Sequence, residues 1–322
     1  MAILGIDISK DTIDAVLLSE ASEVWKKFPN NLKGCEQLKR WLKNRKAVDV
    51  HVCMEATGSY YEELAEALVD AGYLVSVVNP AQIKAFSQSL LARTKTDKID
   101  ASIIAAFCKS HRPSAWIPLT LKERTLRGLV RLNSNLKATR ASYQTQLQTP
   151  NILPAVESPI EQLLASLSEQ IEALEQEIAR LIDADPDLKR RHILLTSIDG
   201  IADTTASLIL AEVPRLHEFS DAKAVGAYAG LSSHHKTSGS SVRGRGGICK
   251  IGNSLLRTGL WWPAIVAIRH NPRLREFSER LTQRGKPKKK IIVAAMRKLL
   301  VYAYGVLKSG IPFKKGPLTA GC

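Results

Sequence analysis

The sequence of 322 residues is poor in cysteine and lacks any motif that would pair its thiols. The five cysteines are Cys35, Cys53, Cys108, Cys249 and Cys322. They are odd in number, far apart and without a C-x-x-C pair, so neither a disulfide framework nor a zinc site is indicated. A G-x-x-x-x-G-K-[ST] phosphate loop is also missing, so no nucleotide cofactor is expected. A reducing cytoplasm fits this pattern.

Long apolar runs without charge are missing too. The most apolar late segment, residues 291–310, carries Arg297 and Lys298 near its centre, which predicts a buried or amphipathic helix and not a membrane span. The chain opens directly on MAILGIDIS, without the basic and apolar stretches of a secretory signal. We therefore expect no membrane partner.

Acidic residues are scarce in the last third of the chain. Residues 232–322 carry 19 Lys and Arg but only two acids, Glu276 and Glu279, whereas residues 1–231 carry 27 bases and 29 acids. The formal net charge of +15 therefore comes entirely from the last third. Such a concentration of positive charge indicates a polyanion as partner, most commonly nucleic acid. The alternative is a solvated basic surface.

The first part of the chain alternates between two patterns. Short β-prone runs predict strands over residues 2–8, 13–18, 24–28, 48–54 and 73–79. Helical patterns lie between and after them, around 35–43, 60–72, 81–91 and 97–110. This alternation predicts an α/β domain over residues 1–115.

From residue 116 the sequence predicts helices only. A helical stretch over 121–148 is followed by a segment in which Ser158 is the expected N-cap, Pro159 the first helical residue and Glu161 the end of a capping box. Apolar residues then recur at spacings of three and four, at Leu164, Leu167, Ile171, Leu174, Ile178 and Leu181. We interpret residues 116–188 as a helical connector with a short coiled-coil segment, half of a hairpin or a protomer contact. An ordinary amphipathic helix is the alternative.

Residues 189–322 predict a second, mainly helical domain. Within it, residues 197–213 match a helix-hairpin-helix around Gly200, where backbone N–H groups approach a phosphate. Plain packing of two helices is the alternative. Further helices are predicted over 251–270 and 287–308.

Four acids stand at positions that suit a metal site. Asp7 ends the first apolar strand, Glu55 follows the strand ending at Met54, and Asp97 and Asp100 lie three apart at a helix start. Carboxylates grouped in this way would bind Mg²⁺ or Mn²⁺ and leave open positions for a phosphate. Each acid also has a structural explanation, since Asp97 favours a helix N-terminus and Asp7 can cap a turn.

The opening GIDISKD is also typical of actin-like ATPases and sugar kinases. A nucleotide site of that kind needs further glycine-rich phosphate loops, and the sequence has none.

The segment TSGSSVRGRGG, residues 237–247, combines serines, glycines and cations. A serine such as Ser241 becomes a nucleophile only with help from a base, a metal ion or cationic surroundings. Arg243, Arg245 and Lys250 are placed to hold a phosphodiester, and His234 and His235 are candidate bases. On composition alone, a flexible loop that contacts phosphates fits equally well. Other cations expected to bind nucleic acid are Arg257 and, on one face of the helix over 121–148, Arg124, Arg127 and Arg131.

An ordered set of motifs runs along nearly the whole chain. The motifs are GIDISKD, MEATGSYYEELA, VNPAQIKAFSQS, RTKTDKIDASIIAAF, SIDGIADTTAS, YAGL, SGSSVRGRGG, CKIGNSLLR and KSGIPF. Together they resemble the DEDD transposases of the insertion-sequence 110 family, which includes the Piv DNA invertases. The resemblance implies a RuvC-like N-terminal domain of RNase H fold and a C-terminal transposase domain with a nucleophilic serine. Its acidic tetrad corresponds to Asp7, Glu55, Asp97 and Asp100, and its serine to Ser241.

The resemblance also implies the reaction and the partners. Ser241 would form a phosphoserine with DNA, with Mg²⁺ on the acidic tetrad. The implied partners are donor and target DNA, a non-coding bridge RNA that pairs with both, and further copies of the chain in a dimer or tetramer. Such a protein would work in the bacterial cytoplasm at the nucleoid. The paired histidines in SSHHKTSG, with no proline before the serine motif, depart from the family pattern.

Several alternatives stay open at this point. An RNA-guided transposase and a Piv-like invertase fit the sequence equally. In a RuvC-like structure-specific nuclease the four acids would activate water, and the second domain would only grip DNA. A catalytically inert nucleic-acid-binding protein is the last alternative.

Overall fold

The computed structural model describes residues 2–20, 22–47, 49–90, 96–234, 237–238, 242–243 and 247–314. The chain divides into two compact units, Met1–Pro118 and Leu119–Cys322. The first is a mixed α/β unit and the second is mainly helical, which confirms the predicted combination of an α/β part with an α part. The finer division into residues 1–115, 116–188 and 189–322 stays a prediction.

A five-stranded mixed sheet forms the centre of the first unit. Its strands are β1 (Ala2–Ile8), β2 (Thr12–Leu18), β3 (Glu23–Pro29), β4 (Val50–Glu55) and β5 (Leu74–Val78). The spatial order is β3-β2-β1-β4-β5, with β1 antiparallel to β2 and parallel to β4. The predicted strands are confirmed: the apolar runs of β1, β2 and β4 are buried, whereas β3, at the edge of the sheet, is mostly exposed.

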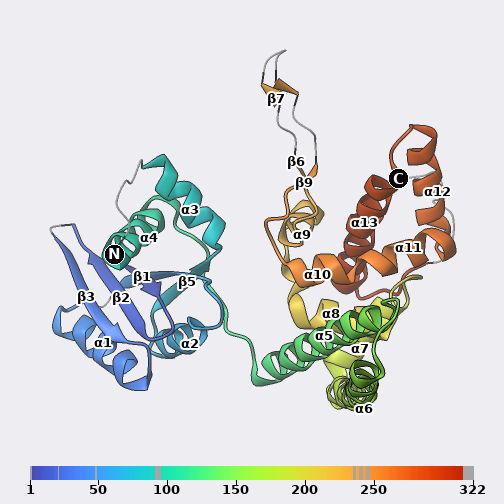
Figure 1. Cartoon of the computed structure of the whole chain (residues 1–322). Helices are drawn as coiled ribbons and strands as arrows, with labels where there is room; N and C mark the ends of the chain where they lie inside the picture. Colours follow the sequence, from blue (N-terminus) through green and yellow to red (C-terminus); the bar gives the residue numbers. More distant parts are fainter. Residues whose placement is uncertain are drawn as a thin grey trace. The chain divides into compact units, whose positions relative to one another are not determined.

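Helices cover both faces of this sheet (Figure 1). They are α1 (Leu32–Asn44), α2 (Glu62–Asp70), α3 (Pro80–Ser89) and α4 (Asp97–His111). Leu38 of α1 and Leu64 of α2 belong to the core on one face, and Ile104 of α4 belongs to the core on the other. Because side chains alternate across a strand, every second residue of β1 faces α4.

Helix α4 approaches β1 closely at Gly5. A Cβ atom on Gly5 would lie 2.3 Å from both the carbonyl oxygen of Ala101 and the backbone nitrogen of Ala105. Only a residue without a side chain permits this distance. Gly5 therefore fixes how near the start of α4, with its two acids, comes to the sheet.

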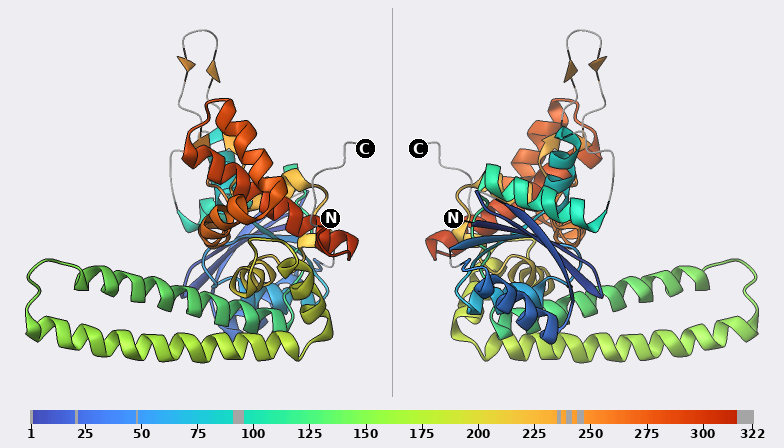
Figure 2. Two further views of the ribbon diagram at one scale, coloured as in Figure 1. Left: turned by 90° about the vertical axis from the view of Figure 1, so that its right-hand side faces the viewer. Right: turned by 90° about the vertical axis from the view of Figure 1, so that its left-hand side faces the viewer.

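The second unit begins with a long helical hairpin. It consists of α5 (Leu121–Leu147) and α6 (Pro154–Asp183), which lie side by side in both views of Figure 2. Val130 of α5 and Ile171 and Ile178 of α6 are buried. The predicted hairpin is confirmed, and the spacing of the apolar residues on α6 marks the face that packs.

The predicted start of α6 was wrong. Ser158 is not an N-cap, because the helix already begins at Pro154, and Pro159 lies inside it. Pro154 occupies the first helical position, where its missing N–H is not needed. Pro159 is one turn further on and removes a single backbone hydrogen bond close to the helix end.

Seven further α-helices and one short 3₁₀ helix complete the second unit among the described residues. They are α7 (Pro186–Thr196), α8 (Asp203–Glu212), η1 (Leu216–Glu218), α9 (Ala222–Tyr228), α10 (Ser254–Gly259), α11 (Trp261–His270), α12 (Pro272–Gln283) and α13 (Lys288–Ser309). Residues 251–270, predicted as one helix, form two, α10 and α11, and α12 was not predicted. One core unites this unit, including Leu126 of α5 and Leu299 of α13. Within the described ranges, no helix has both the length and the apolar character needed to cross a bilayer.

We expect Gly5→Ala to destabilise the first unit by about 2 to 3 kcal/mol, because the added methyl group pushes backbone atoms of α4 away from β1. Urea unfolding followed by tryptophan fluorescence measures this. Gly128→Ala is the matched control, since Gly128 is exposed on α5 and its Cβ would meet nothing within 4 Å. That change should stabilise the chain by about 1 kcal/mol. Equal unfolding midpoints for Gly5→Ala and the wild type would contradict the packing argument.

Candidate functional site

Two of the predicted acids stand at the ends of neighbouring parallel strands. Ile6 pairs with Met54, so Asp7 and Glu55, the next residue on each strand, are neighbours at the carboxyl ends of β1 and β4. Asp7 projects from the same face as Gly5, which contacts α4. These two carboxylates therefore lie at one edge of the sheet, on the face that α4 covers.

The other two predicted acids lie in the first turn of α4. Thr96 is the N-cap, and its Oγ1 accepts a hydrogen bond from the backbone N–H of Ile99 at 3.3 Å. This cap starts the helix at Asp97, so Asp97 and Asp100 share the first turn. The packing of α4 on β1 brings that turn toward Asp7.

The electrostatics of Asp7 reflect its burial and the acids around it. Its pKa is raised from the ordinary 3.8 to about 6. Burial is the largest cause, and the negative charges of Asp100, Asp97, Glu55 and Asp14 follow in that order. A carboxylate surrounded by others favours its neutral form, because each neighbour repels its charge.

A fifth acid and a lysine belong to this cluster and were not predicted. Asp14 on β2 pairs directly with Asp7 across the strands and is only 2% exposed. Its Oδ1 accepts a hydrogen bond from Trp25 Nε1 at 3.0 Å, and its Oδ2 lies 3.0 Å from Lys27 Nζ. Lys27 Nζ also lies 3.1 Å from Asp97 Oδ2. Lys27 thus links the sheet to the first turn of α4.

Lys27 has a raised pKa, chiefly because of its hydrogen bonds to Asp14 and then Asp97. The strand pairing that creates this bridge places Asp14 opposite Lys27. The only available signal in the sequence was the alternation along β2 and β3, which does not reveal which residues are paired.

Carboxylates are suitable ligands for a divalent cation, but in this structure the acids are not arranged around one common point. Among the described residues, no group of three or more His, Cys, Asp or Glu side chains is arranged so that it could hold a metal ion as it stands. Carboxylate oxygens are the preferred ligands of Mg²⁺. A cation beside Asp7 would remove the repulsion that raises the pKa of this carboxyl group.

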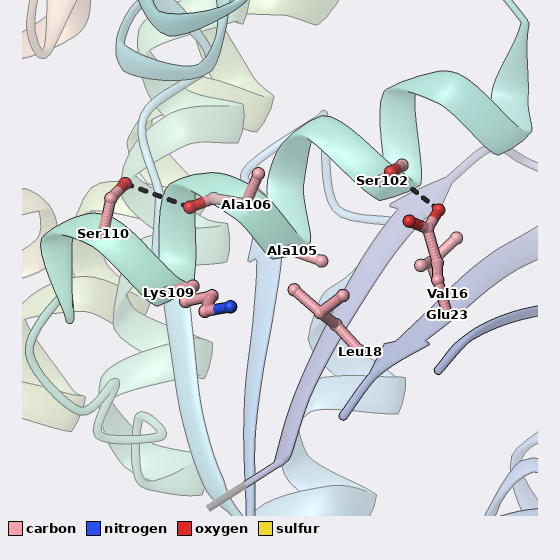
Figure 3. A pocket seen from close by; sticks show the side chains of 8 residues that line it. All are labelled: Val16, Leu18, Glu23, Ser102, Ala105, Ala106, Lys109 and Ser110. Atoms are coloured by element: carbon pink, nitrogen blue, oxygen red, sulfur yellow. Dashed lines mark hydrogen bonds between the residues drawn. The ribbon is translucent and has the colours of Figure 1, made fainter. Parts of the chain in front are cut away.

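A shallow pocket lies elsewhere on the same face of the sheet (Figure 3). It has a volume of about 550 Å³ and is lined by Val16, Leu18, Glu23, Ser102, Ala105, Ala106, Lys109 and Ser110. Ser102 Oγ donates a hydrogen bond to Glu23 Oε1 across it at 2.9 Å. None of the four predicted acids lines this pocket, so the carboxylate cluster is a separate feature of this face.

The predicted nucleophile lies outside the described residues. Ser241 and Arg245 belong to the undescribed part, and Arg243 is described only in its backbone. Around them, β6 (Ser233–His234) pairs with β9 (Gly247–Ile248), and β7 (Thr237–Ser238) pairs with β8 (Val242–Arg243), both antiparallel. Ser241 is the residue directly before β8.

The base of this segment is held by a buried glutamate. Glu212, at the end of α8, is 1% exposed, and its carboxylate accepts hydrogen bonds from Arg131 Nε at 2.7 Å and Arg131 Nη2 at 3.0 Å. Asn253, the N-cap of α10, donates to the same carboxylate at 2.5 Å. Tyr228, at the end of α9, donates to the backbone oxygen of Glu212 at 3.0 Å. The residues before and after the serine segment are thus fastened to one point.

Burial alone would raise the pKa of Glu212, but the hydrogen bonds from Arg131 and Asn253 outweigh burial and hold it below the ordinary 4.5. Arg257 adds a second tie, since its Nη1 donates to the carbonyl oxygens of Ala229 at 3.0 Å and Lys250 at 3.3 Å. Hydrogen bonds thus connect α5, α8, α9 and the start of α10 on the two sides of the serine segment.

The cations predicted to bind nucleic acid have different surroundings. Arg131 pairs with Glu212, and Arg127 Nε donates to the carbonyl oxygen of Ala211 at 3.0 Å, so both have structural roles within the chain. Arg124 and Lys250 are exposed. Contacts of all these cations and of Arg257 with nucleic acid stay predictions.

Close packing against α11 explains why position 200 is a glycine. Its φ is +103°, and a Cβ here would lie 2.4 Å from the Cβ of Ala267 on α11. The glycine lets the turn between α7 and α8 pack on α11. A phosphate contact at this turn stays a prediction.

Comparisons with known proteins give consistent results. A family model for DEDD transposases of the IS110 type, described as "Transposase", matches residues 4–153, and one described as "Transposase IS116/IS110/IS902 family" matches residues 192–279. The pilin gene-inverting proteins of Moraxella bovis and Moraxella lacunata are each 35% identical over 317 residues, which cover 97% of both chains. A probable family 20 transposase of Pseudomonas aeruginosa is 28% identical over 252 residues, 68% of this chain and 71% of the relative.

We expect Asp7→Asn to stabilise the chain at neutral pH when divalent ions are absent. The folded pKa of about 6 lies above the ordinary 3.8, so the stability that comes from protonated Asp7 is complete below 3.8 and is lost as the pH rises through 6. The gain at pH 8 should be about 2 kcal/mol, allowing for partial solvent exposure. Thermal unfolding in EDTA between pH 4 and pH 8 measures it.

The matched control for this change is Asp11→Asn, at an exposed acid in the turn between β1 and β2. It should alter stability little at any pH. An effect of Asp7→Asn that does not depend on pH would contradict the electrostatic explanation.

We expect Glu212→Gln to destabilise the second unit by about 2 kcal/mol, because it removes the charge that pairs with Arg131. Since the folded pKa is lowered, the wild-type advantage is present above the ordinary 4.5 and should disappear as the pH falls below it. Urea unfolding at pH 7 and pH 3.5 measures the difference in free energy of unfolding between this variant and the wild type at each pH. Glu218→Gln, at an exposed acid, is the control and should change little. Equal stability of Glu212→Gln and the wild type at pH 7 would count against the role of this pair.

Proposed function

The chain belongs to the IS116/IS110/IS902 family of transposases, and on this basis we propose that it recombines DNA through a covalent phosphoserine at Ser241. The chain is thus an enzyme that cuts and rejoins DNA, and an inert binding protein is excluded. The observation that carries the site assignment is the convergence of Asp97, Asp100 and Glu55 on Asp7, at one edge of the sheet.

The first unit supports the proposal that it is RuvC-like, with an RNase H fold. Its sheet has three parallel strands, with an antiparallel pair at one side, in the order β3-β2-β1-β4-β5. Acids at the ends of the central strands β1 and β4, and at the start of α4, are where such a site needs its ligands.

Strand cleavage would be a transfer of one phosphodiester. Ser241 Oγ attacks phosphorus, a bond from Oγ to phosphorus forms, and the bond from phosphorus to the 3′-oxygen breaks. Ser241 Oγ loses its proton, and the departing 3′-oxygen takes up a proton to become a 3′-hydroxyl. A 3′-hydroxyl of the partner strand then attacks the phosphoserine and restores Ser241. The ester conserves the bond energy, so no nucleotide cofactor is required.

Residues of the chain would serve this reaction in two groups. Asp7, Glu55, Asp97 and Asp100 would hold Mg²⁺ or Mn²⁺. When bound, the ion would lower the pKa of the attacking hydroxyl and neutralise phosphate charge. Arg243, Arg245 and Lys250 would hold the phosphodiester next to Ser241. The frame around Glu212 would limit how far the serine segment can move.

The partners follow from the same proposal. Donor and target DNA are the substrates, and a bridge RNA would choose them by base pairing, so that the protein contacts mainly backbone. A dimer or tetramer would bring the exchanging strands together. The exposed Leu153, Val156 and Leu163 near the start of α6 are suited to a contact between copies of the hairpin.

Inversion of a DNA segment is the second candidate outcome. The two relatives that match over 97% of the chain are pilin gene-inverting proteins. Inversion and transposition share the same chemistry and differ in how the exchanging sites are arranged.

Labelled DNA incubated with protein, RNA and Mg²⁺ tests the serine intermediate. We expect label to migrate with denatured protein, and Ser241→Ala should reduce this adduct by at least about a thousandfold. Ser238→Ala is the matched control in the same segment and should keep it. Cleavage that persists in Ser241→Ala but is lost in Asp7→Asn would instead identify a RuvC-like nuclease that uses water.

A further inference from the structure

The corner between α12 and α13 carries an unpaired concentration of positive charge. Five basic residues lie within seven positions: Arg284, Lys286, Lys288, Lys289 and Lys290. All five are exposed, and in the described part of the chain none of them forms an ion pair. We call these five residues the basic corner.

Three of these charges occupy a position that is unfavourable for the fold. Lys288, Lys289 and Lys290 form the first turn of α13, which contains no acid and has no side-chain cap. The N-terminus of a helix is the positive end of its dipole, so cations there are repelled. Helices α5 and α7, by contrast, have an acid in the first turn, Glu123 and Asp187. An anion at the basic corner would remove this repulsion.

A groove begins at the same corner. It lies between α11, α12 and α13, has a volume of about 420 Å³, and is lined by Ile265, Ile268, Arg269, Ser278, Thr282, Lys288, Ile291 and Ile292. Its lining combines four isoleucines with two cations and two hydroxyl groups. Lys288 belongs to both the groove and the basic corner, so the two features are continuous.

An exposed tryptophan extends the groove along α11. Trp262 is 71% exposed. It lies three residues before Ile265 and seven before Arg269, so the three side chains share one helix face. Exposed aromatic rings beside cations are surfaces on which unpaired bases stack, because every base has a flat π face.

We propose that α11 and the basic corner form a binding track for an unpaired nucleic-acid strand. This proposal rests on the proposed function, because recombination of DNA supplies such strands. Phosphates would lie on Lys288, Lys289 and Lys290, and bases would lie over the groove and Trp262. Single strands of DNA and RNA share this chemistry. A duplex would reach the phosphate positions but would not offer unpaired bases to Trp262.

Three variants of the protein separate the parts of the track. Lys288→Ala, Lys289→Ala and Lys290→Ala together remove three phosphate contacts, and alanine is the best helix former. Trp262→Ala removes the stacking surface, and Trp262→Phe retains a ring. The charge control combines Lys33→Ala, Arg40→Ala and Lys43→Ala, three exposed cations on α1 of the other unit.

Fluorescence anisotropy with labelled single-stranded DNA, the same sequence as RNA, and duplex DNA measures affinity over a range of salt. For the triple lysine variant we expect weaker single-strand binding, and a slope of log affinity against log salt that is smaller by about 2. Trp262→Ala should lose about tenfold on single strands and little on duplex, and Trp262→Phe should restore most of it. The α1 variant should match the wild type.

The triple lysine variant should lose affinity but gain thermal stability, which provides a second measurement. Because it removes like charge from the positive end of α13, its unfolding temperature should rise by about 2 to 4 °C. Weaker binding by a more stable protein cannot result from misfolding.

Several outcomes would overturn the track. These are unchanged affinity and salt slope in the triple lysine variant, equal losses of duplex and single-strand binding in Trp262→Ala, or competition by polyglutamate as strong as by single-stranded DNA. The larger loss, on DNA or on RNA, identifies which strand uses the track. A wild-type protein that binds no nucleic acid would instead remove the proposed function itself, and a Ser241 adduct formed normally by the lysine variant would leave that function intact.

Discussion

The close contact between Gly5 and α4 is the constraint on which the candidate site depends. It lets the helix lie against β1 with backbone atoms where a side chain would otherwise be. The first turn of α4 therefore comes near the ends of β1 and β4, and its two acids come near Asp7. Burial and then the repulsion from these acids raise the pKa of Asp7, which is a cost to the fold at neutral pH. Lys27 offsets part of that cost by bridging Asp14 and Asp97.

The two units manage their charges in opposite ways. In the first, negative groups gather on one edge of a sheet and leave room for added positive charge. In the second, the important acid, Glu212, is fully satisfied by Arg131 and Asn253, while the cations at the start of α13 have no counter-charge in the described structure. The proposed reaction would use both: cations held by the first unit and a polyanion held by the second.

The sequence was sufficient for the elements but not for their contacts. Strands β1 to β5 and most helices follow from apolar periodicity, whereas the acidic tetrad, taken from positions at strand and helix ends and from the family resemblance, stays a prediction. Asp14 and Lys27 were missed because strand pairing, and not spacing, brings them together. The pairing of Arg131 with Glu212 was missed because the two residues are 81 positions apart in sequence. The start of α6 was mispredicted at Pro159, because a proline is tolerated both at the first position of a helix and about one turn later. Ser241 was identified by resemblance and stays a prediction.

The anchoring of Arg131 on Glu212 has a mechanical consequence. Helix α5 has 27 residues and therefore measures about 40 Å, and Arg131 lies in its first half. The hairpin is a lever whose short arm reaches, through Glu212, the residues on either side of the serine segment. A rotation of about 5° at Arg131 would move the far end of α5, about 24 Å away, by about 2 Å. A displacement of the tip would reach Tyr228 and Asn253 reduced in size, because the arm on their side is shorter.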